Sequence, residues 1–156
     1  MPGEPAVATA PASRTKPSLT LKRRLAAPPD RCFRAWTEPE ALKRWFGPPN
    51  TEIVVAESDP RVGGRYRLVM RAADGEEHDV SGEYREVVAN RRLVFTWAWR
   101  TTPERQSLVT VEFAPDGGAT ALTVTHEQFA DEEARDRHRQ GWTGALDKLV
   151  VFCAAR

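Results

Sequence analysis

The clearest hydrophobic pattern in the chain lies in residues 131–155. Apolar and semi-polar side chains recur there at steps of three or four, which places them on one helical stripe. Its members are Ala134, His138, Trp142, Leu146, Leu149 and Cys153. Asp131 and the two glutamates after it suit the positive end of a helix as N-cap and acidic first turn. The pattern predicts one helix of about 24 residues, roughly 36 Å long, which needs an equally long partner surface.

Upstream, apolar positions alternate with polar ones, as in strands that bury one face. The first such segment covers residues 18–25, where Arg23 interrupts a row of leucines. Six more segments follow between residues 53 and 126, separated by short turns such as the Asp74-Gly75 hairpin turn. Because each connection is short, these six strands are expected to form an antiparallel meander.

Two short helices are expected between the first strand and the second. Residues 28–30, Pro-Pro-Asp, open the first of them. Thr37 and Glu40 form a capping-box pattern around Pro39, which predicts the start of the second helix. Gly47 and the two prolines after it end that helix.

This order of elements predicts an α+β fold with one helical layer on one face of a sheet. A curved antiparallel sheet of about seven strands would wrap around the long C-terminal helix, with a cavity between them. Residues 1–17 are rich in alanine and proline and have no periodicity, so we expect a disordered tail there. Residues 18–155 are then expected to form a single domain.

Composition narrows the classes of function. The 23 basic and 22 acidic residues leave a net charge of +1, which argues against a nucleic-acid binder. No apolar run approaches the ~18 residues of a membrane span, and no signal-peptide pattern is present. Two cysteines are too few for a disulfide scaffold, and no Cys/His spacing fits zinc. We therefore expect a reduced, cytoplasmic protein without a metal or other cofactor.

Six segments stand in a recognisable order. They are FRAWTEPEALKRWFGP (33–48), DPRVGGRYRLVM (59–70), GEYREV (82–87), LVFTWAW (93–99), THEQF (125–129) and HRQGWTGALDKL (138–149). In this order they resemble the helix-grip superfamily, which includes START lipid-transfer domains, birch-pollen-type allergens and polyketide cyclases. They are most similar to bacterial single-domain proteins that resemble the C-terminal domain of the heat-shock chaperone ATPase activator. The resemblance implies a helix-grip fold over nearly all of residues 18–155.

Ten residues are expected to line the cavity between the sheet and the terminal helix. Aromatic rings would bury an apolar ligand, while histidines and tyrosines would orient its polar end. The alternative is ordinary core packing for the rings, and a backbone or carboxylate partner for each histidine. The ten are Trp45, Tyr66, Met70, Tyr84, Phe95, Trp97, Trp99, His126, His138 and Trp142.

Residues 57–64 form a charged loop before a glycine pair. Glu57, Asp59 and Arg61 are expected to form salt bridges within it. The alternative is that Arg61 holds an anionic ligand group at the cavity mouth, since a guanidinium binds carboxylates bidentately. Gly63 and Gly64 are most simply a turn that needs positive φ.

Three functions fit this sequence. The first is binding of a small hydrophobic or amphipathic molecule. The second is a polyketide-cyclase-like or other enzyme, with His126 or His138 as general base and a tyrosine such as Tyr84 as acid. The third is a stress-linked module that contacts a chaperone. The eukaryotic activator has a separate N-terminal domain that does much of the chaperone work, and about 17 residues take its place here.

Two structural features separate these functions. An open cavity would favour either of the first two over a protein-interaction module, which would expose an apolar patch instead. Polar groups that converge on one point of the cavity would favour the enzyme. The sequence leaves the oligomeric state open, a homodimer included.

Overall fold

The computed structural model describes residues 16–155, so the tail expected at residues 1–17 lies almost entirely outside the described residues. Seven strands and three helices make up the described part of the chain. Their order is β1 (Leu19–Leu25), α3 (Pro29–Thr37), α4 (Pro39–Trp45), β2 (Thr51–Ser58), β3 (Arg65–Ala72), β4 (Glu77–Val88), β5 (Arg92–Trp99), β6 (Ser107–Asp116), β7 (Ala119–Glu127) and α5 (Glu132–Ala154).

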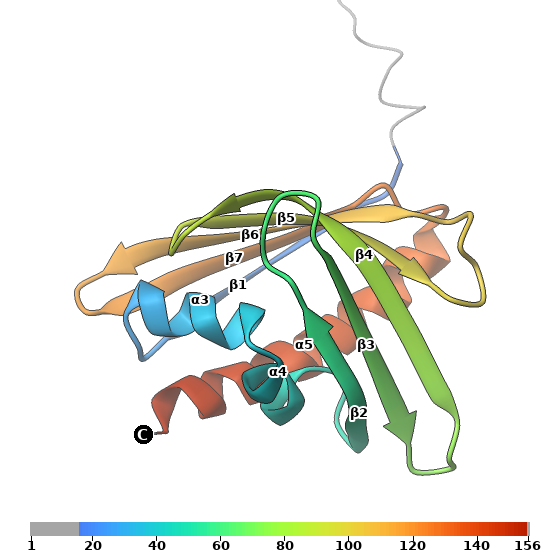
Figure 1. Ribbon diagram of the computed structural model, residues 1–156, viewed down its shortest axis with the longest axis horizontal. Helices are drawn as coiled ribbons and strands as arrows, with labels where there is room; N and C mark the ends of the chain where they lie inside the picture. Colours follow the sequence, from blue (N-terminus) through green and yellow to red (C-terminus); the bar gives the residue numbers. More distant parts are fainter. Residues whose placement is uncertain (1–15, 156) are drawn as a thin grey trace, which may run out of the picture.

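The seven strands form one antiparallel sheet in the order β1-β7-β6-β5-β4-β3-β2. The strands β2 to β7 are a meander, as predicted, and β1 joins its far edge by pairing with β7, Leu19 opposite His126. Since β1 and β2 lie at opposite edges, α3 and α4 cross between them. Figure 1 shows the sheet curling over α5, with the two short helices on the same side. The predicted α+β fold, a curved sheet around a long terminal helix, is confirmed.

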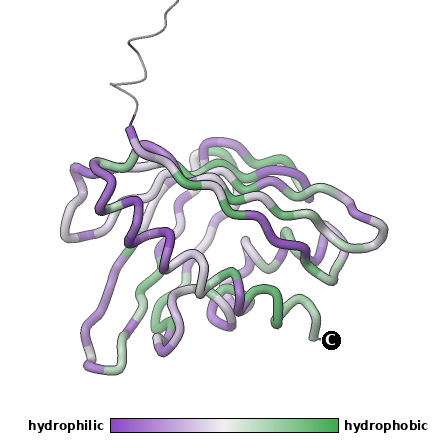
Figure 2. The backbone as a smooth tube through the Cα atoms, turned by 180° about the vertical axis from the view of Figure 1, so that it is seen from behind, coloured by the Kyte–Doolittle hydropathy of each residue, from purple (hydrophilic) through white to green (hydrophobic). Residues whose placement is uncertain are grey.

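The two halves of α5 meet the sheet differently. Asp131 caps the helix as predicted, since its side chain accepts a hydrogen bond from the Ala134 amide at 2.8 Å. The second half buries Leu146, Leu149 and Cys153 in the core. Figure 2 shows that the first half is mostly hydrophilic and the second mostly hydrophobic.

Neither α5 nor another helix within residues 16–155 is both long and apolar enough to cross a bilayer.

The predicted capping box at the start of α4 is wrong. Thr37 is instead the last residue of α3, and its hydroxyl donates to the Phe33 carbonyl at 3.0 Å. Glu38 is the N-cap residue of α4 and makes no side-chain capping bond. Because Pro39 at the first helical position has no N–H, this helix start has one donor fewer to satisfy.

The short helices are joined by buried aromatic rings. The indole of Trp45 is fully buried in α4 and donates to the Ala35 carbonyl of α3 at 2.9 Å. Its ring also packs edge-on against Trp36 at 4.8 Å and Phe46 at 5.4 Å between centroids. These contacts fix α4 against α3 and so position the segment after α4, which closes one side of the cavity described below.

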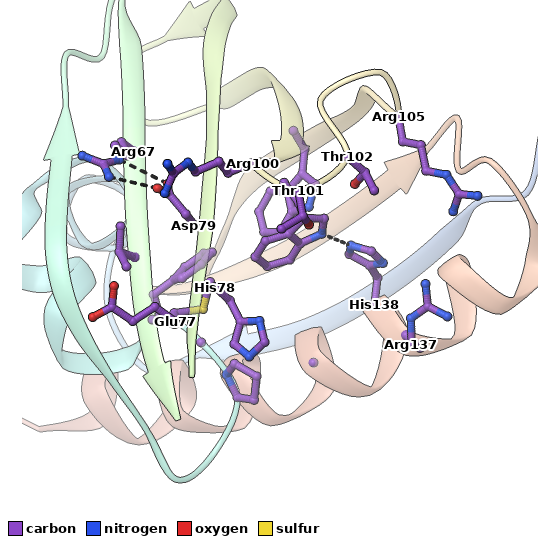
Figure 3. A pocket seen from close by; sticks show the side chains of 18 of the residues that line it. Arg67, Glu77, His78, Asp79, Arg100, Thr101, Thr102, Arg105, Arg137 and His138 are labelled. Carbon is purple, nitrogen blue, oxygen red and sulfur yellow. Dashed lines mark hydrogen bonds and ion pairs between the residues drawn. The ribbon is translucent and has the colours of Figure 1, made fainter. Parts of the chain in front are cut away.

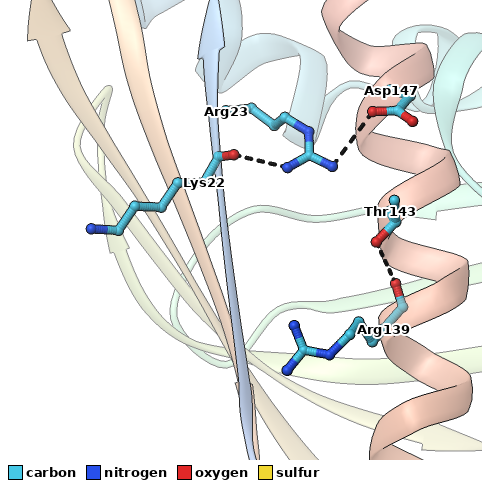
Figure 4. Close-up of polar contacts among 5 residues, drawn as sticks. All are labelled: Lys22, Arg23, Arg139, Thr143 and Asp147. Atoms are coloured by element: carbon cyan, nitrogen blue, oxygen red, sulfur yellow. Dashed lines mark hydrogen bonds and ion pairs between the residues drawn. The ribbon is translucent and has the colours of Figure 1, made fainter.

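Arg23 interrupts the row of leucines on β1 because it pairs with α5. Its Nη2 lies 3.4 Å from Asp147 Oδ1, and its Nη1 donates to the Lys22 carbonyl at 2.9 Å. Figure 4 shows the guanidinium between β1 and the helix, while the Lys22 side chain extends away from the helix. The polar residue within the apolar pattern therefore joins the edge of the sheet to α5.

Candidate functional site

A cavity of about 820 Å³ lies between the first half of α5 and the sheet. Sites for small molecules commonly enclose 300–1,000 Å³. Helix α5 contributes Ala134, His138 and Trp142, and β5 contributes Trp97 and Trp99. The lining is completed by β2, the β3–β4 hairpin, the β5–β6 loop and the segments after α4 and β7. Figure 3 shows part of this lining from close by.

The inner wall of the cavity is made of aromatic rings that support one another. Trp97 lies 5.4 Å from Trp142 and 5.5 Å from Trp99 between ring centroids. Phe46 closes the wall on the α4 side, 5.8 Å from Trp142. Because each ring is held by its neighbours, the apolar surface is formed before any ligand enters.

Five of the ten residues expected at the cavity do line it: Met70, Trp97, Trp99, His138 and Trp142. The other five lie elsewhere in the core. Tyr66, Tyr84 and Phe95 surround a void of only about 20 Å³ beneath α3 and α4. Trp45 is buried between those helices, and His126 lies behind the aromatic wall.

Both tyrosine hydroxyls form hydrogen bonds within the sheet. Tyr66 donates to the Thr96 carbonyl at 2.6 Å, and the Tyr84 hydroxyl lies 2.8 Å from Ser58 Oγ. Burial raises the pKa of both phenols above the ordinary tyrosine value. Tyr84, the candidate acid, therefore lies outside the large cavity with its hydroxyl already hydrogen-bonded.

Both ring nitrogens of His138 are engaged. Nε2 lies 2.9 Å from Trp99 Nε1, and Nδ1 lies 2.7 Å from the Ala134 carbonyl oxygen. An indole N–H can only donate, so Nε2 accepts and Nδ1 carries the proton that it donates to Ala134. Burial lowers the pKa of His138, although the hydrogen bond to Ala134 opposes the shift. The ring is therefore neutral near pH 7, in one tautomer.

His126 has the opposite tautomer for the same reason. Trp142 Nε1 donates to its Nδ1 at 3.0 Å, so the proton lies on Nε2, 2.7 Å from Ser107 Oγ. The Ser107 hydroxyl in turn donates to the Trp97 carbonyl at 3.3 Å. Burial lowers the pKa of His126 well below its ordinary value, and the nearby His138 adds to this shift. The fully buried imidazole is thus satisfied at both nitrogens.

These bonds decide what the two histidines can do chemically. A general base needs a free lone pair within reach of the substrate proton. In His126 and His138 that lone pair accepts a bond from a tryptophan, so proton abstraction would first require breaking that bond. The two hydrogen bonds cross the interface between sheet and helix in opposite directions, from β5 to α5 and from α5 to β7.

The rim of the cavity is charged, which the sequence patterns did not reveal. Within residues 16–155, five arginines and three carboxylates line the cavity: Arg67, Arg71, Arg100, Arg105, Arg137, Glu76, Glu77 and Asp79. Arg67 binds Asp79 bidentately, at 3.2 and 2.9 Å, and Arg71 binds Glu77 at 3.3 and 3.0 Å. The alternating arginines of β3 were the available signal, but periodicity alone does not place them at a cavity.

Arg61 takes the salt-bridged arrangement. It binds Asp59 at 2.9 Å in the loop before β3 and does not line the large cavity. No three His, Cys, Asp or Glu side chains of the described chain gather as a metal site would require.

Comparisons with known proteins agree with this architecture. Residues 26–154 match the family model for activator of Hsp90 ATPase homolog 1-like proteins. The human activator of 90 kDa heat shock protein ATPase homolog 1 is 29% identical over 125 residues, which cover 80% of this chain and 33% of the human protein. The chain thus spans a third of that relative's length.

Bacterial proteins of known structure match over nearly their whole length. One from Chromobacterium violaceum is 30% identical with a TM-score of 0.81, covering 90% of this chain and 99% of its own. One from Silicibacter pomeroyi, described as AHSA1, is 30% identical with a TM-score of 0.79, covering 88% and 98%.

Proposed function

The chain belongs to the family of activator of Hsp90 ATPase homolog 1-like proteins, and we propose that it binds a small amphipathic molecule in the cavity between its sheet and α5. The cavity itself carries this proposal: about 820 Å³ of space, walled by packed aromatic rings and rimmed by charged side chains. Burial of apolar ligand surface against the wall would contribute about 25 cal/mol per Å². The charged rim would keep the polar end of the ligand at the opening.

The histidine geometry favours binding over the enzyme hypothesis. The predicted general base requires a lone pair that faces the cavity. His138 lines the cavity, but its acceptor nitrogen is bonded to Trp99. His126 is fully buried and bonded to Trp142 and Ser107.

The surface favours small-molecule binding over a chaperone-contacting module. A protein-interaction module would expose a contiguous apolar patch. Among the described residues, the strongly exposed large hydrophobic side chains are Val62, Val88 and Val151, which lie in the β2–β3 loop, at the end of β4 and near the end of α5. They lie on three separate elements. As a separate point, the human relative is about three times as long as the part that this chain matches.

A neutral fluorescent probe tests this proposal. N-phenyl-1-naphthylamine should bind the wild-type protein with stoichiometry near one, and native mass spectrometry should show the complex. Gly141 lines the cavity, and a Cβ built there meets only Pro48 Cγ, at 4.0 Å. Gly141→Leu should therefore place a bulky apolar side chain in the cavity, against the aromatic wall, and weaken probe binding about tenfold or more.

Gly141→Ala is the matched control, because it makes the same change in helix propensity but adds one methyl group. It should bind the probe nearly as well as the wild type. A probe that does not bind the wild type, or that binds Gly141→Leu equally well, would rule out the cavity as the site.

A further inference from the structure

Four of the five arginines at the cavity rim fall into two groups. The fifth, Arg100, lies beside the Arg67–Asp79 pair, and its backbone N–H donates to the Asp79 carbonyl at 2.8 Å. Arg67 and Arg71 are each held by two hydrogen bonds to a carboxylate of the neighbouring strand. Arg105 and Arg137 have only loose partners, Asp131 at 3.8 Å and Glu133 at 3.4 Å. The guanidinium groups of Arg105 and Arg137 are therefore available to an anionic ligand.

The partners of Arg105 and Arg137 are exposed to solvent. The side chain of Glu133 is 83% exposed and that of Asp131 is 49% exposed. Ion pairs in such positions contribute little to stability, because water screens them. An anionic group from a ligand could therefore replace either carboxylate at little cost.

The two arginines reach the rim from different elements. Arg105 lies in the β5–β6 loop, whose turn is fixed by two backbone bonds, Thr102 N–H to the Trp99 carbonyl at 3.0 Å and Arg105 N–H to the Thr102 carbonyl at 2.9 Å. Arg137 precedes His138 on α5, and the His138 ring is bonded to Trp99 on β5. Figure 3 shows both guanidinium groups on the same side of the cavity, next to His138. The loop and the helix thus present two cations toward one part of the opening.

Resting on the proposed function, we infer that the ligand is an amphipathic molecule with one anionic head group, a carboxylate or a phosphate, bound by Arg105 and Arg137. Guanidinium groups bind both anions through paired charge-assisted hydrogen bonds. The apolar part of the ligand would then extend inward against Trp97, Trp99 and Trp142, which line the cavity below.

The carboxylates at the rim do not favour a cationic ligand instead. Asp79 and Glu77 are already paired with Arg67 and Arg71 across the β3–β4 hairpin. Figure 3 shows that this hairpin side lies opposite Arg105 and Arg137. A negative head group can therefore approach the two arginines without facing these acids closely.

Two probes with the same aromatic body test the inference. 1-Anilinonaphthalene-8-sulfonate carries an anionic group, and N-phenyl-1-naphthylamine does not. The double variant Arg105→Gln/Arg137→Gln should weaken sulfonate-probe binding about tenfold or more. It should change binding of the neutral probe less than about twofold. Added salt should weaken only the sulfonate probe, since screening acts on charge.

Two arginine variants serve as controls. Arg24→Gln removes an exposed arginine that is paired with Asp116 and does not line the cavity. Arg100→Gln removes a rim arginine from the opposite side, beside the Arg67–Asp79 pair in Figure 3. Neither should approach the effect of the double variant. An equal or larger effect of Arg100→Gln would overturn the assignment of the head group to Arg105 and Arg137.

Competition with dodecanoate, dodecyl phosphate and dodecanol, each below its micelle concentration, identifies the head group. Stronger displacement of the sulfonate probe by dodecanoate or dodecyl phosphate than by dodecanol supports the inference. The anion that displaces the probe more strongly identifies the head group as a carboxylate or a phosphate. Equal displacement by all three compounds, together with unchanged binding of the sulfonate probe by the double variant, overturns the anionic head group. The proposed function would still stand. If neither probe binds the wild type, the proposed function fails and this inference fails with it.

Discussion

Trp142 on α5 donates its indole N–H to Nδ1 of His126 on β7, over 3.0 Å, inside the core. A second bond runs the other way, from Trp99 on β5 to His138 on α5 at 2.9 Å. The two imidazoles lie 5.2 Å apart and nearly perpendicular, at 77°. This pair of bonds fixes both tautomers and holds the helix to the sheet where the cavity reduces apolar contact.

Trp142→Phe should destabilise the protein more than Trp99→Phe, although both remove the same atoms. The first leaves a nitrogen of the fully buried His126 without a donor, which costs about 1–3 kcal/mol. The second leaves a nitrogen of the half-buried His138 at the cavity, where water can replace the indole. Urea unfolding of both variants measures the difference.

A double-mutant cycle isolates the buried bond from the loss of ring volume. Trp142→Phe, His126→Leu and the double variant should show a coupling free energy of about 1 kcal/mol or more. Additive effects of the two substitutions would show that packing alone accounts for the role of Trp142.

The stability of the protein should decrease as the pH falls below about 6.5, the ordinary pKa of histidine. Burial lowers the pKa of His126 and His138 in the folded state, so the unfolded chain takes up protons that the folded protein does not. The free energy of unfolding should then fall by up to about 1.4 kcal/mol per pH unit for each histidine. Above about pH 7.5 these two groups contribute no slope.

Urea unfolding between pH 5.5 and pH 7.5 measures this slope. His78→Gln alters the third histidine, which is exposed on β4, and should keep the slope because His126 and His138 remain. A free energy of unfolding that stays constant over this range would contradict the buried, neutral state of the two rings.

The local parts of the fold were predictable from the sequence. The apolar stripe of α5 and its Asp131 cap depend on spacing within one helix, and both are observed. Strand alternation likewise predicted the inward face of most strands, such as Tyr66, Leu68 and Met70 on β3. Spacing does not say what lies opposite that face. Tyr66 and Met70 share the inner face of β3, but the first packs beneath α3 and α4 while the second borders the cavity.

The rim of the site depends on parts of the chain that have no periodicity. Arg105 lies in the β5–β6 loop, so no hydrophobic pattern could place it. Arg137 lies on the exposed side of the α5 pattern, where a charged residue is expected in any helix. Their shared position at the opening arises only when the sheet curls over the helix.

The glycine pair before β3 also shows that a local sequence pattern cannot reveal close contacts with other parts of the chain. It gives a further prediction. Gly63 has the expected positive φ of 86°, with open space around it, so Gly63→Ala should cost about 1–2 kcal/mol of backbone strain. Gly64 has no such φ, but a Cβ there would lie 2.0 Å from the Asp59 carbonyl oxygen. Gly64→Ala must displace backbone and should cost at least as much, about 1–3 kcal/mol or more. Equal stability of Gly64→Ala and wild type in urea would contradict the close approach.

The two glycines of α5 should respond to alanine with opposite sign. A Cβ at Gly141 has space, and replacing a helical glycine by alanine contributes about 0.5–1 kcal/mol, so Gly141→Ala should stabilise the protein. A Cβ at Gly144 would lie 2.5 Å from Cδ of Pro49, in the loop after α4. Lys148 Nζ donates to the carbonyls of Phe46 and Pro48 at 3.4 and 3.3 Å and holds that loop against the helix.

Because the loop is tied down by Lys148, it cannot move aside freely for a methyl group at Gly144. Gly144→Ala should therefore lose the gain in helix propensity and destabilise the protein by about 1–3 kcal/mol through overpacking. Thermal unfolding of the two variants side by side provides the comparison, since both make the same chemical change in the same helix. If both variants were stabilised alike, the loop after α4 would not pack against α5 as closely as the structure indicates, and this side of the cavity would be open.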